Sequence, residues 1–205
     1  MFLVFHCVLD FGYTLSLIFA VTCSIPVFAS DIRDDMESSQ GSWRVVDAGT
    51  RILDKSDSII ALMESENLSY NRAVQEYNEL LASSQRLEER YITYDAGMGY
   101  LIEVGCQVKV ACGSGHCNFV EVIKEWSEAS GSGDYTWNAF YVTVTIEGNT
   151  SDTLRFQTRG TLEVAVESSM TTGFEAAGFS VSGTIGGTTY FRKTLSINQT
   201  KVMGG

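Results

Sequence analysis

The sequence predicts an α+β protein in which an N-terminal leader and a long helix, or a helical hairpin, precede an antiparallel β-domain. Two changes along the chain support this prediction. An apolar start turns abruptly polar after residue 29, and the spacing of apolar residues changes from about 3.5 to about 2 near residue 95. These changes divide the chain into a leader (1–29), a polar linker (30–50), a helical segment (51–95) and a β-domain (96–205).

The leader is predicted to be a secretory signal peptide. It contains no Lys or Arg and is apolar almost throughout, and Val27 and Ala29 place small residues before a cleavage site at Ser30. The apolar stretch from Phe11 to Ala29 is close to the length of a membrane helix, so a retained membrane anchor is the alternative. Under either interpretation we expect the rest of the chain outside the cytoplasm, in the periplasm, on the cell surface or secreted. The membrane is a partner only if the leader is retained.

The charge of the chain excludes one class of partner. The sequence has 25 Asp and Glu against 14 Lys and Arg, a formal net charge of −11. No basic cluster offsets this excess, and nucleic-acid binding depends on Lys and Arg that neutralise phosphates. We therefore expect no nucleic-acid partner.

A long helix, or a helical hairpin, is predicted over about 51–92. This stretch is rich in Leu, Glu, Ala, Gln and Arg and contains no Gly or Pro. A break is expected near residues 65–69. The helix is expected either to pack on its own β-domain or to form a coiled coil that joins copies of the chain. Its apolar residues recur at about 3.5 spacing: Ile52, Ile59, Met63, Tyr70, Ala73, Tyr77, Leu80, Leu87 and Tyr91.

An antiparallel sheet or sandwich of six or seven strands is predicted over about 98–198. Apolar residues alternate with others from Tyr100 to Cys112, which is typical of a half-buried strand. The Gly186-Gly187 pair is expected at a hairpin turn. Short connections between strands favour an antiparallel arrangement. Further strands are expected at 118–126, 140–146, 154–167 (one long strand or two), 179–185 and 188–197.

The stretch CGSGHC predicts a disulfide between Cys112 and Cys117. In a hairpin with a four-residue loop these residues face each other across two strands, and an oxidising compartment favours the bond. Cys106 is then a buried free thiol or a link to another chain. The alternative is a zinc site of Cys106, Cys112, His116 and Cys117, which we disfavour because Cys106 lies more than about 15 Å from Cys112 on an extended strand. No cofactor is expected.

An exposed aromatic surface is predicted around the Ser-Gly-Ser-Gly loop of residues 130–133. If Phe140, Val142 and Val144 face inward, the alternate residues of that strand face solvent and offer a surface for a protein or carbohydrate partner. The alternative is that this face packs under the long helix. The residues of this surface are Trp126, Tyr135, Trp137 and Tyr141.

Catalysis is not expected. His116 is the one histidine after the leader, and no nucleophile elbow, phosphate loop or His-Glu-x-x-His motif occurs. Two carboxylates that meet in a cleft cannot be recognised from sequence, so a carboxylate-based hydrolase stays as an alternative.

The order of segments and one short motif suggest a further alternative. Gly12-Tyr13-Thr14-Leu15 opens the apolar stretch, and a predicted long helix and a β-domain with late cysteines follow. In these features the chain resembles type IV pilin-like proteins, which implies processing after Gly12 and a membrane-anchored assembly subunit. The main prediction is a secreted or envelope structural or binding protein. The pilin-like subunit, the hydrolase and a carbohydrate-binding module are the alternatives.

Overall fold

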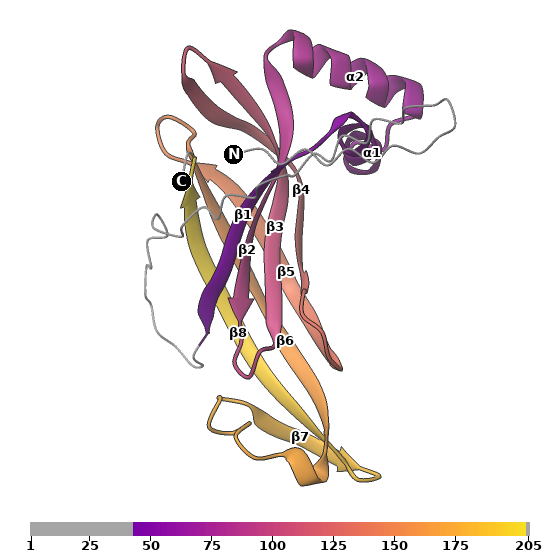
Figure 1. Ribbon diagram of the computed structural model, residues 1–205, viewed down its shortest axis with the longest axis vertical. Coiled ribbons are helices and arrows are strands. Elements are labelled where there is room, and N and C mark those ends of the chain that lie inside the picture. Colours follow the sequence, from indigo (N-terminus) through magenta and orange to yellow (C-terminus); the bar gives the residue numbers. More distant parts are fainter. Residues whose placement is uncertain (1–42, 204–205) are drawn as a thin grey trace, which may run out of the picture.

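The computed structural model describes residues 43–203, which form a sandwich of two four-stranded antiparallel sheets with two short helices at one end (Figure 1). Sheet A has the order β1-β2-β3-β4, with β1 (Arg44–Ile52), β2 (Gln85–Asp95), β3 (Leu101–Gly113) and β4 (His116–Ala129). Sheet B has the order β5-β6-β8-β7, with β5 (Tyr135–Glu147), β6 (Thr153–Glu167), β7 (Ser180–Ile185) and β8 (Thr188–Val202). The helices are α1 (Lys55–Ser65) and α2 (Tyr70–Ala82), and Ser168–Met170 forms a 3₁₀ turn.

The predicted α+β fold with a long helix or helical hairpin over about 51–92 is wrong. That stretch contains the end of β1, the two short helices and β2, so the protein is mostly β and no coiled coil forms there. The helical run stops twice, because Asn67 and Ser84 have φ angles of 52° and 57°, outside the helical region. After Ser84 the chain forms β2, which is hydrogen-bonded to β1 on one side and to β3 on the other. These backbone hydrogen bonds override the helical propensity of the Arg-Leu-Glu-Glu-Arg run.

The β-rich character of the C-terminal part is confirmed. Strands β3 to β8 fall where the alternating pattern predicts them, and Gly186 and Gly187 form the β7–β8 turn with φ angles of 59° and 86°. The eight strands exceed the predicted six or seven because β1 and β2 were not recognised. Strand β6 runs without a break past Arg159 and Gly160.

The leader prediction concerns residues 1–29, which lie outside the described residues. Within residues 43–203, no helix has both the length and the apolar character needed to cross a membrane.

The main core lies between the two sheets and combines apolar side chains from both. A second cluster occupies the end of the sandwich near β7, where Phe174 stacks on Phe191 with ring centroids 4.4 Å apart. In this second cluster, Phe174 and Phe179 cover the end of the inner face of sheet B. The main core contains Ile92, Tyr94, Val104, Cys106, Val108, Val110 and Phe119 from sheet A, and Val144, Leu154, Phe156 and Ile197 from sheet B.

The helices cover part of the outer face of sheet A. Leu62, Ala73 and Leu80 pack against Leu87 of β2 in a third apolar cluster. The Lys109 ammonium group, on the same face, forms ion pairs with carboxylates from the α1–α2 connection, from α2 and from β4. The outer face of sheet B stays open, because the described helices lie on the other sheet (Figure 1).

Candidate functional site

The four aromatic residues of the predicted binding surface do not come together. Trp126 lies half-buried on sheet A, where its ring covers Gly105 and its indole N–H donates to Glu103 at 3.1 Å. Trp137 is 8% exposed and belongs to the core, with its indole N–H donated to Ser127 at 2.8 Å.

Tyr135 and Tyr141 have different environments. The Tyr135 hydroxyl donates to the Leu101 carbonyl at 2.8 Å and accepts from the Gly131 amide at 2.5 Å, so Tyr135 fastens the β4–β5 connection to β3. Tyr141 is 47% exposed on sheet B. Of the four predicted residues, Tyr141 alone is available as an exposed contact.

A β-bulge in β5 explains why the predicted faces are mixed. Ala139 is paired with Gly160 and Tyr141 with Arg159, which leaves Phe140 as an extra residue. The bulge shifts the alternation by one position, so Trp137 before it and Val144 after it both point into the core. Phe140, which the alternation placed inside, is 63% exposed beside Tyr141. The predicted inward position of Phe140 is therefore wrong.

The exposed aromatic pair borders a polar surface, which we call the outer face of sheet B. Directly paired residues share a face of the sheet. Arg159 is paired with Tyr141 on one side and with Ser196 on the other. The next row contains Thr143, Gln157 and Asn198, and the row on the other side contains Asn138, Thr161 and Thr194. These rows offer hydroxyl and amide groups and no carboxylate.

Arg159 provides an unpaired cation at the centre of this face. Arg155 is held by Glu147 at 2.7 Å and by Asn198 at 3.1 Å, and Arg192 is held by Glu163 at 2.9 Å. The guanidinium group of Arg159 is exposed and forms no hydrogen bond or ion pair with any residue in the described part of the chain. It is therefore free to bind an external acceptor.

The cysteines lie as the sequence predicts. Cys112 and Cys117 are paired across the β3–β4 hairpin and joined in a disulfide. Cys106 is a free thiol that is fully buried in the main core, and burial raises its pKa to about 12. A thiol with so high a pKa stays protonated and is a weak nucleophile.

The alternative zinc ligands are not arranged as a site. The two cysteines in the disulfide have no free thiolate, Cys106 is enclosed in the core and His116 is exposed at the hairpin end. Among residues 43–203, no group of three or more His, Cys, Asp or Glu side chains is placed to hold a metal ion.

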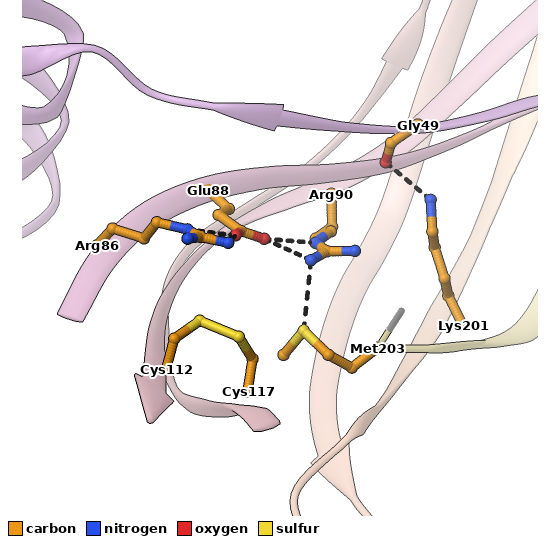
Figure 2. A network of polar contacts seen from close by, with 8 residues as sticks. All are labelled: Gly49, Arg86, Glu88, Arg90, Cys112, Cys117, Lys201 and Met203. Atoms are coloured by element: carbon orange, nitrogen blue, oxygen red, sulfur yellow. Dashed lines mark hydrogen bonds and ion pairs between the residues drawn. A yellow bond between two sulfur atoms is a disulfide. The ribbon is translucent and has the colours of Figure 1, made fainter. Parts of the chain in front are cut away.

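A buried charge network lies between the sheets at the same end as the disulfide (Figure 2). Glu88 is fully buried and accepts hydrogen bonds from Arg86 at 2.7 Å and from Arg90 at 2.9 Å. The Arg90 guanidinium group also donates to the Met203 sulfur at 3.4 Å and lies over the Phe119 ring. Each charge has a partner of opposite sign or a polarisable neighbour, so we interpret this network as structural.

Lys201 joins the two sheets next to this network. It is 9% exposed, and its ammonium group donates to the Gly49 carbonyl of β1 at 2.8 Å (Figure 2). Burial, assisted by the nearby positive charge of Arg90, lowers the Lys201 pKa to about 8.

The surface of the described residues also has hollows near α1 and near β7. The first, about 260 Å³, lies between α1 and sheet A, and three carboxylates line it. Two of these are in ion pairs, Glu89 with Arg51 and Glu64 with Lys124 at 2.8 Å, so the hollow gives no support to the hydrolase alternative. The second, about 420 Å³, lies beside β7 and is lined mainly by hydroxyl groups.

Comparisons with models of protein families, with curated proteins and with solved structures found no match to this chain.

Proposed function

We propose that this chain is an extracytoplasmic binding protein, without catalytic activity, that holds a carboxylate-bearing glycan on the outer face of sheet B. The observation that supports this function best is the β5 bulge. It places Phe140 and Tyr141 side by side in solvent, next to the unpaired Arg159. The disulfide pair and the apolar leader sequence support the extracytoplasmic location.

The aromatic pair suits a sugar ring. Soluble proteins rarely expose two large aromatic side chains together unless they contact a partner. Flat rings contact the apolar face of a sugar, and neighbouring hydroxyl and amide groups bind its hydroxyls. Thr143, Gln157 and Asn198 offer such groups in the row next to Tyr141.

Arg159 selects for a carboxylate on the glycan. A guanidinium group binds a carboxylate through two parallel hydrogen bonds, which gives both energy and orientation. The chain as a whole has a net charge of −11 and repels anions. The rows around Arg159 contain no acid, so an anionic ligand bound to Arg159 meets no carboxylate in these rows.

The pilin-like alternative is not proposed, because the long helix on which it depended is contradicted by the two short helices and β2.

The test is binding of the full chain to polygalacturonate, alginate and hyaluronan, with neutral dextran as the reference polymer, by isothermal titration calorimetry at low and moderate salt. We expect binding to at least one acidic polymer and none to dextran. Phe140→Ser with Tyr141→Ser, and separately Arg159→Gln, should each weaken binding at least tenfold.

The matched controls are Tyr70→Ser and Arg72→Gln on α2. Tyr70 is 61% exposed, and Arg72 lies in an exposed contact with Gln75. Both controls should bind as the wild type does. If the protein binds none of the three acidic polymers, the outer face of sheet B is rejected as the site. The same holds if Arg159→Gln and Arg72→Gln lower the binding affinity equally.

A further inference from the structure

The outer face of sheet A has a row of residues in which glycine and aromatic side chains alternate. Tyr91 of β2 is paired with Gly49 of β1 on one side and with Gly105 of β3 on the other. Gly105 is paired in turn with Trp126 of β4. Directly paired residues share a face of the sheet. These four residues, which we call the aromatic row, therefore lie side by side across all four strands, on the face opposite the main core.

Each aromatic ring lies across a glycine of the neighbouring strand. A Cβ added at Gly49 would collide with the Tyr91 ring, and one added at Gly105 would collide with the Trp126 ring. One side of each ring is therefore packed on the backbone, and the other side is turned away from the sheet. Both side chains are half-buried, and neither ring contacts another ring or a cation in the described part of the chain.

The packing also sets the distance between the rings. The Tyr91 ring lies over β1 and the Trp126 ring lies over β3. Neighbouring strands are about 4.8 Å apart, so the two rings are about 10 Å apart on one surface.

Carboxylates border the aromatic row. The next row of the same face contains Asp47, Glu103 and Glu128. Glu103 accepts the indole N–H of Trp126 at 3.1 Å, and Asp47 accepts the hydroxyl of Tyr91 at 3.5 Å. None of the three carboxylates forms an ion pair with another residue among 43–203. They help to orient the rings, and their negative charge stays uncompensated.

The basic residues nearby do not supply the missing charge. Three of them lie on nearby rows of this face, and each is in an ion pair: Arg44 with Asp95, Arg51 with Glu89, and Lys124 with Glu64. The net charge of −11 adds a field of the same sign as the free carboxylates. A cationic ligand is therefore favoured at the aromatic row.

The hollow beside α1 adjoins the aromatic row. Arg51, Glu89 and Gln107 line it, and they form the row of sheet A on the other side of the aromatic row from Glu103. Asp57 of α1 also lines the hollow and forms no ion pair with a described residue. A ligand on the aromatic row thus meets a further free carboxylate at the border with α1.

We propose that the outer face of sheet A binds a β-1,4-linked glycan that carries protonated amino groups, as chitosan does. The free sides of the two rings contact sugar rings and attract ammonium groups, and the carboxylates accept hydrogen bonds from the same groups. In an extended β-1,4-linked chain alternate sugar rings present the same face, and their separation matches that of Tyr91 and Trp126. A basic peptide has the charge but no flat rings at a fixed spacing.

This site is independent of the proposed site around Arg159. The two lie on opposite faces of the sandwich and favour ligands of opposite charge. Loss of one site therefore does not imply loss of the other.

The test is isothermal titration calorimetry of the full chain with a glucosamine hexamer, its N-acetylated form and hexalysine, at about pH 5.5, where Asp and Glu stay ionised. We expect the glucosamine hexamer to bind at least tenfold more tightly than either of the others. Trp126→Ser should weaken its binding at least tenfold, and so should Asp47→Asn combined with Glu128→Gln. Asp47 and Glu128 are exposed, so the double variant keeps the fold even if Trp126→Ser does not.

The matched controls are Tyr70→Ser and the double variant Glu167→Gln with Glu175→Gln. All three residues are exposed, and the double variant removes the same charge far from the aromatic row. Both controls should bind as the wild type does. The proposal is overturned if the glucosamine hexamer does not bind, or if the N-acetylated hexamer binds as tightly. Equally tight binding of hexalysine would overturn it in favour of a basic peptide, and an equal loss in the two double variants would reduce the effect to net charge.

Discussion

At the scale of single residues, the interior of the sandwich holds charges that the sequence pattern does not reveal. Glu88, Arg90 and Lys201 lie between the sheets, among apolar residues and a buried thiol. Removing one member of such a group leaves its partner buried and uncompensated, which costs more than the pair itself contributes. These residues are therefore coupled to one another in stability, and the pKa of Lys201 is lowered by its burial and by the charge of Arg90.

Lys201 leads to a prediction about pH. Its pKa is about 8 in the folded protein and 10.5 as the ordinary value. Between about pH 8 and pH 10.5, Lys201 is protonated in the unfolded state and mostly neutral in the folded state. The unfolded state therefore binds more protons, and the contribution of Lys201 to the free energy of unfolding increases with pH by at most about 1.4 kcal/mol per pH unit. Urea unfolding of the wild type and of Lys201→Met from pH 7 to 10.5 should show the wild type gaining stability relative to the variant above pH 8. A difference that stays constant with pH would contradict the lowered pKa.

At the scale of elements, the β5 bulge determines which side chains face solvent. The bulge lies opposite Gly160, where an added Cβ would come within 2.6 Å of both the Asn138 carbonyl oxygen and the Trp137 ring. The close approach of β5 to β6 at this point therefore needs a glycine. The exposed positions of Phe140 and Tyr141 depend on the same approach.

Gly160→Ala should consequently destabilise the protein by about 1–3 kcal/mol, as is usual when a tight contact is overpacked. The change should also alter the fluorescence of Trp137, whose ring must move. Gly113→Ala at the β3–β4 hairpin is the control, because an added Cβ there meets nothing within 4 Å. If the two variants are equally stable, the backbone at the bulge moves at little cost to accommodate the added Cβ, and the prediction is wrong.

At the scale of the whole molecule, the helices and the sandwich have separate apolar cores. The main core joins both sheets, whereas the helices pack with Leu87 and Ile123 on the outer face of sheet A. Regions with separate cores can open independently. The helices are held to sheet A by this small cluster and by the ion pairs of Lys109.

Two core substitutions should separate these regions. Phe156→Ala in the main core should lower the free energy of global unfolding by about 3–5 kcal/mol, and amide exchange should accelerate in both sheets. Leu62→Ala in α1 should accelerate exchange in the helices and leave the slowest amides of the sandwich unchanged. Both side chains are fully buried, so the two substitutions are matched in burial. Acceleration of every amide by Leu62→Ala would show that the helices and sandwich unfold together.

The sequence allowed prediction of the parts of the fold in which local pattern and tertiary pairing agree. Strands β3 to β8 show alternation that matches their burial, and the hairpin cysteines are close in the chain, so the disulfide pair followed from spacing. Strand β2 could not be predicted, because its inward positions include Glu88 and Arg90 and its composition favours a helix. Its partners β1 and β3 determine its structure, and one of them, β1, is distant in sequence.

The candidate site shows the same division. The sequence predicted an aromatic-rich strand in this region and indicated that one face of the strand is exposed to solvent. The bulge was not recognisable, because its cause is the close packing of Gly160 against β5. Arg159 was missed for a related reason. It is a candidate ligand-binding residue because it lies beside Tyr141 and Ser196 and forms no ion pair, and both neighbours belong to other strands.

By itself, the sequence determined the acidic charge and allowed prediction of the β-rich C-terminal part and the hairpin disulfide, because each follows from composition or from neighbours in the chain. The tertiary structure alone decided that residues 85–95 are a strand, that Phe140 rather than Trp137 is exposed, and that β7 is an edge strand of sheet B. The physical reason is that strand pairing, register and edge exposure arise from backbone hydrogen bonds between segments distant in sequence, which local periodicity does not encode.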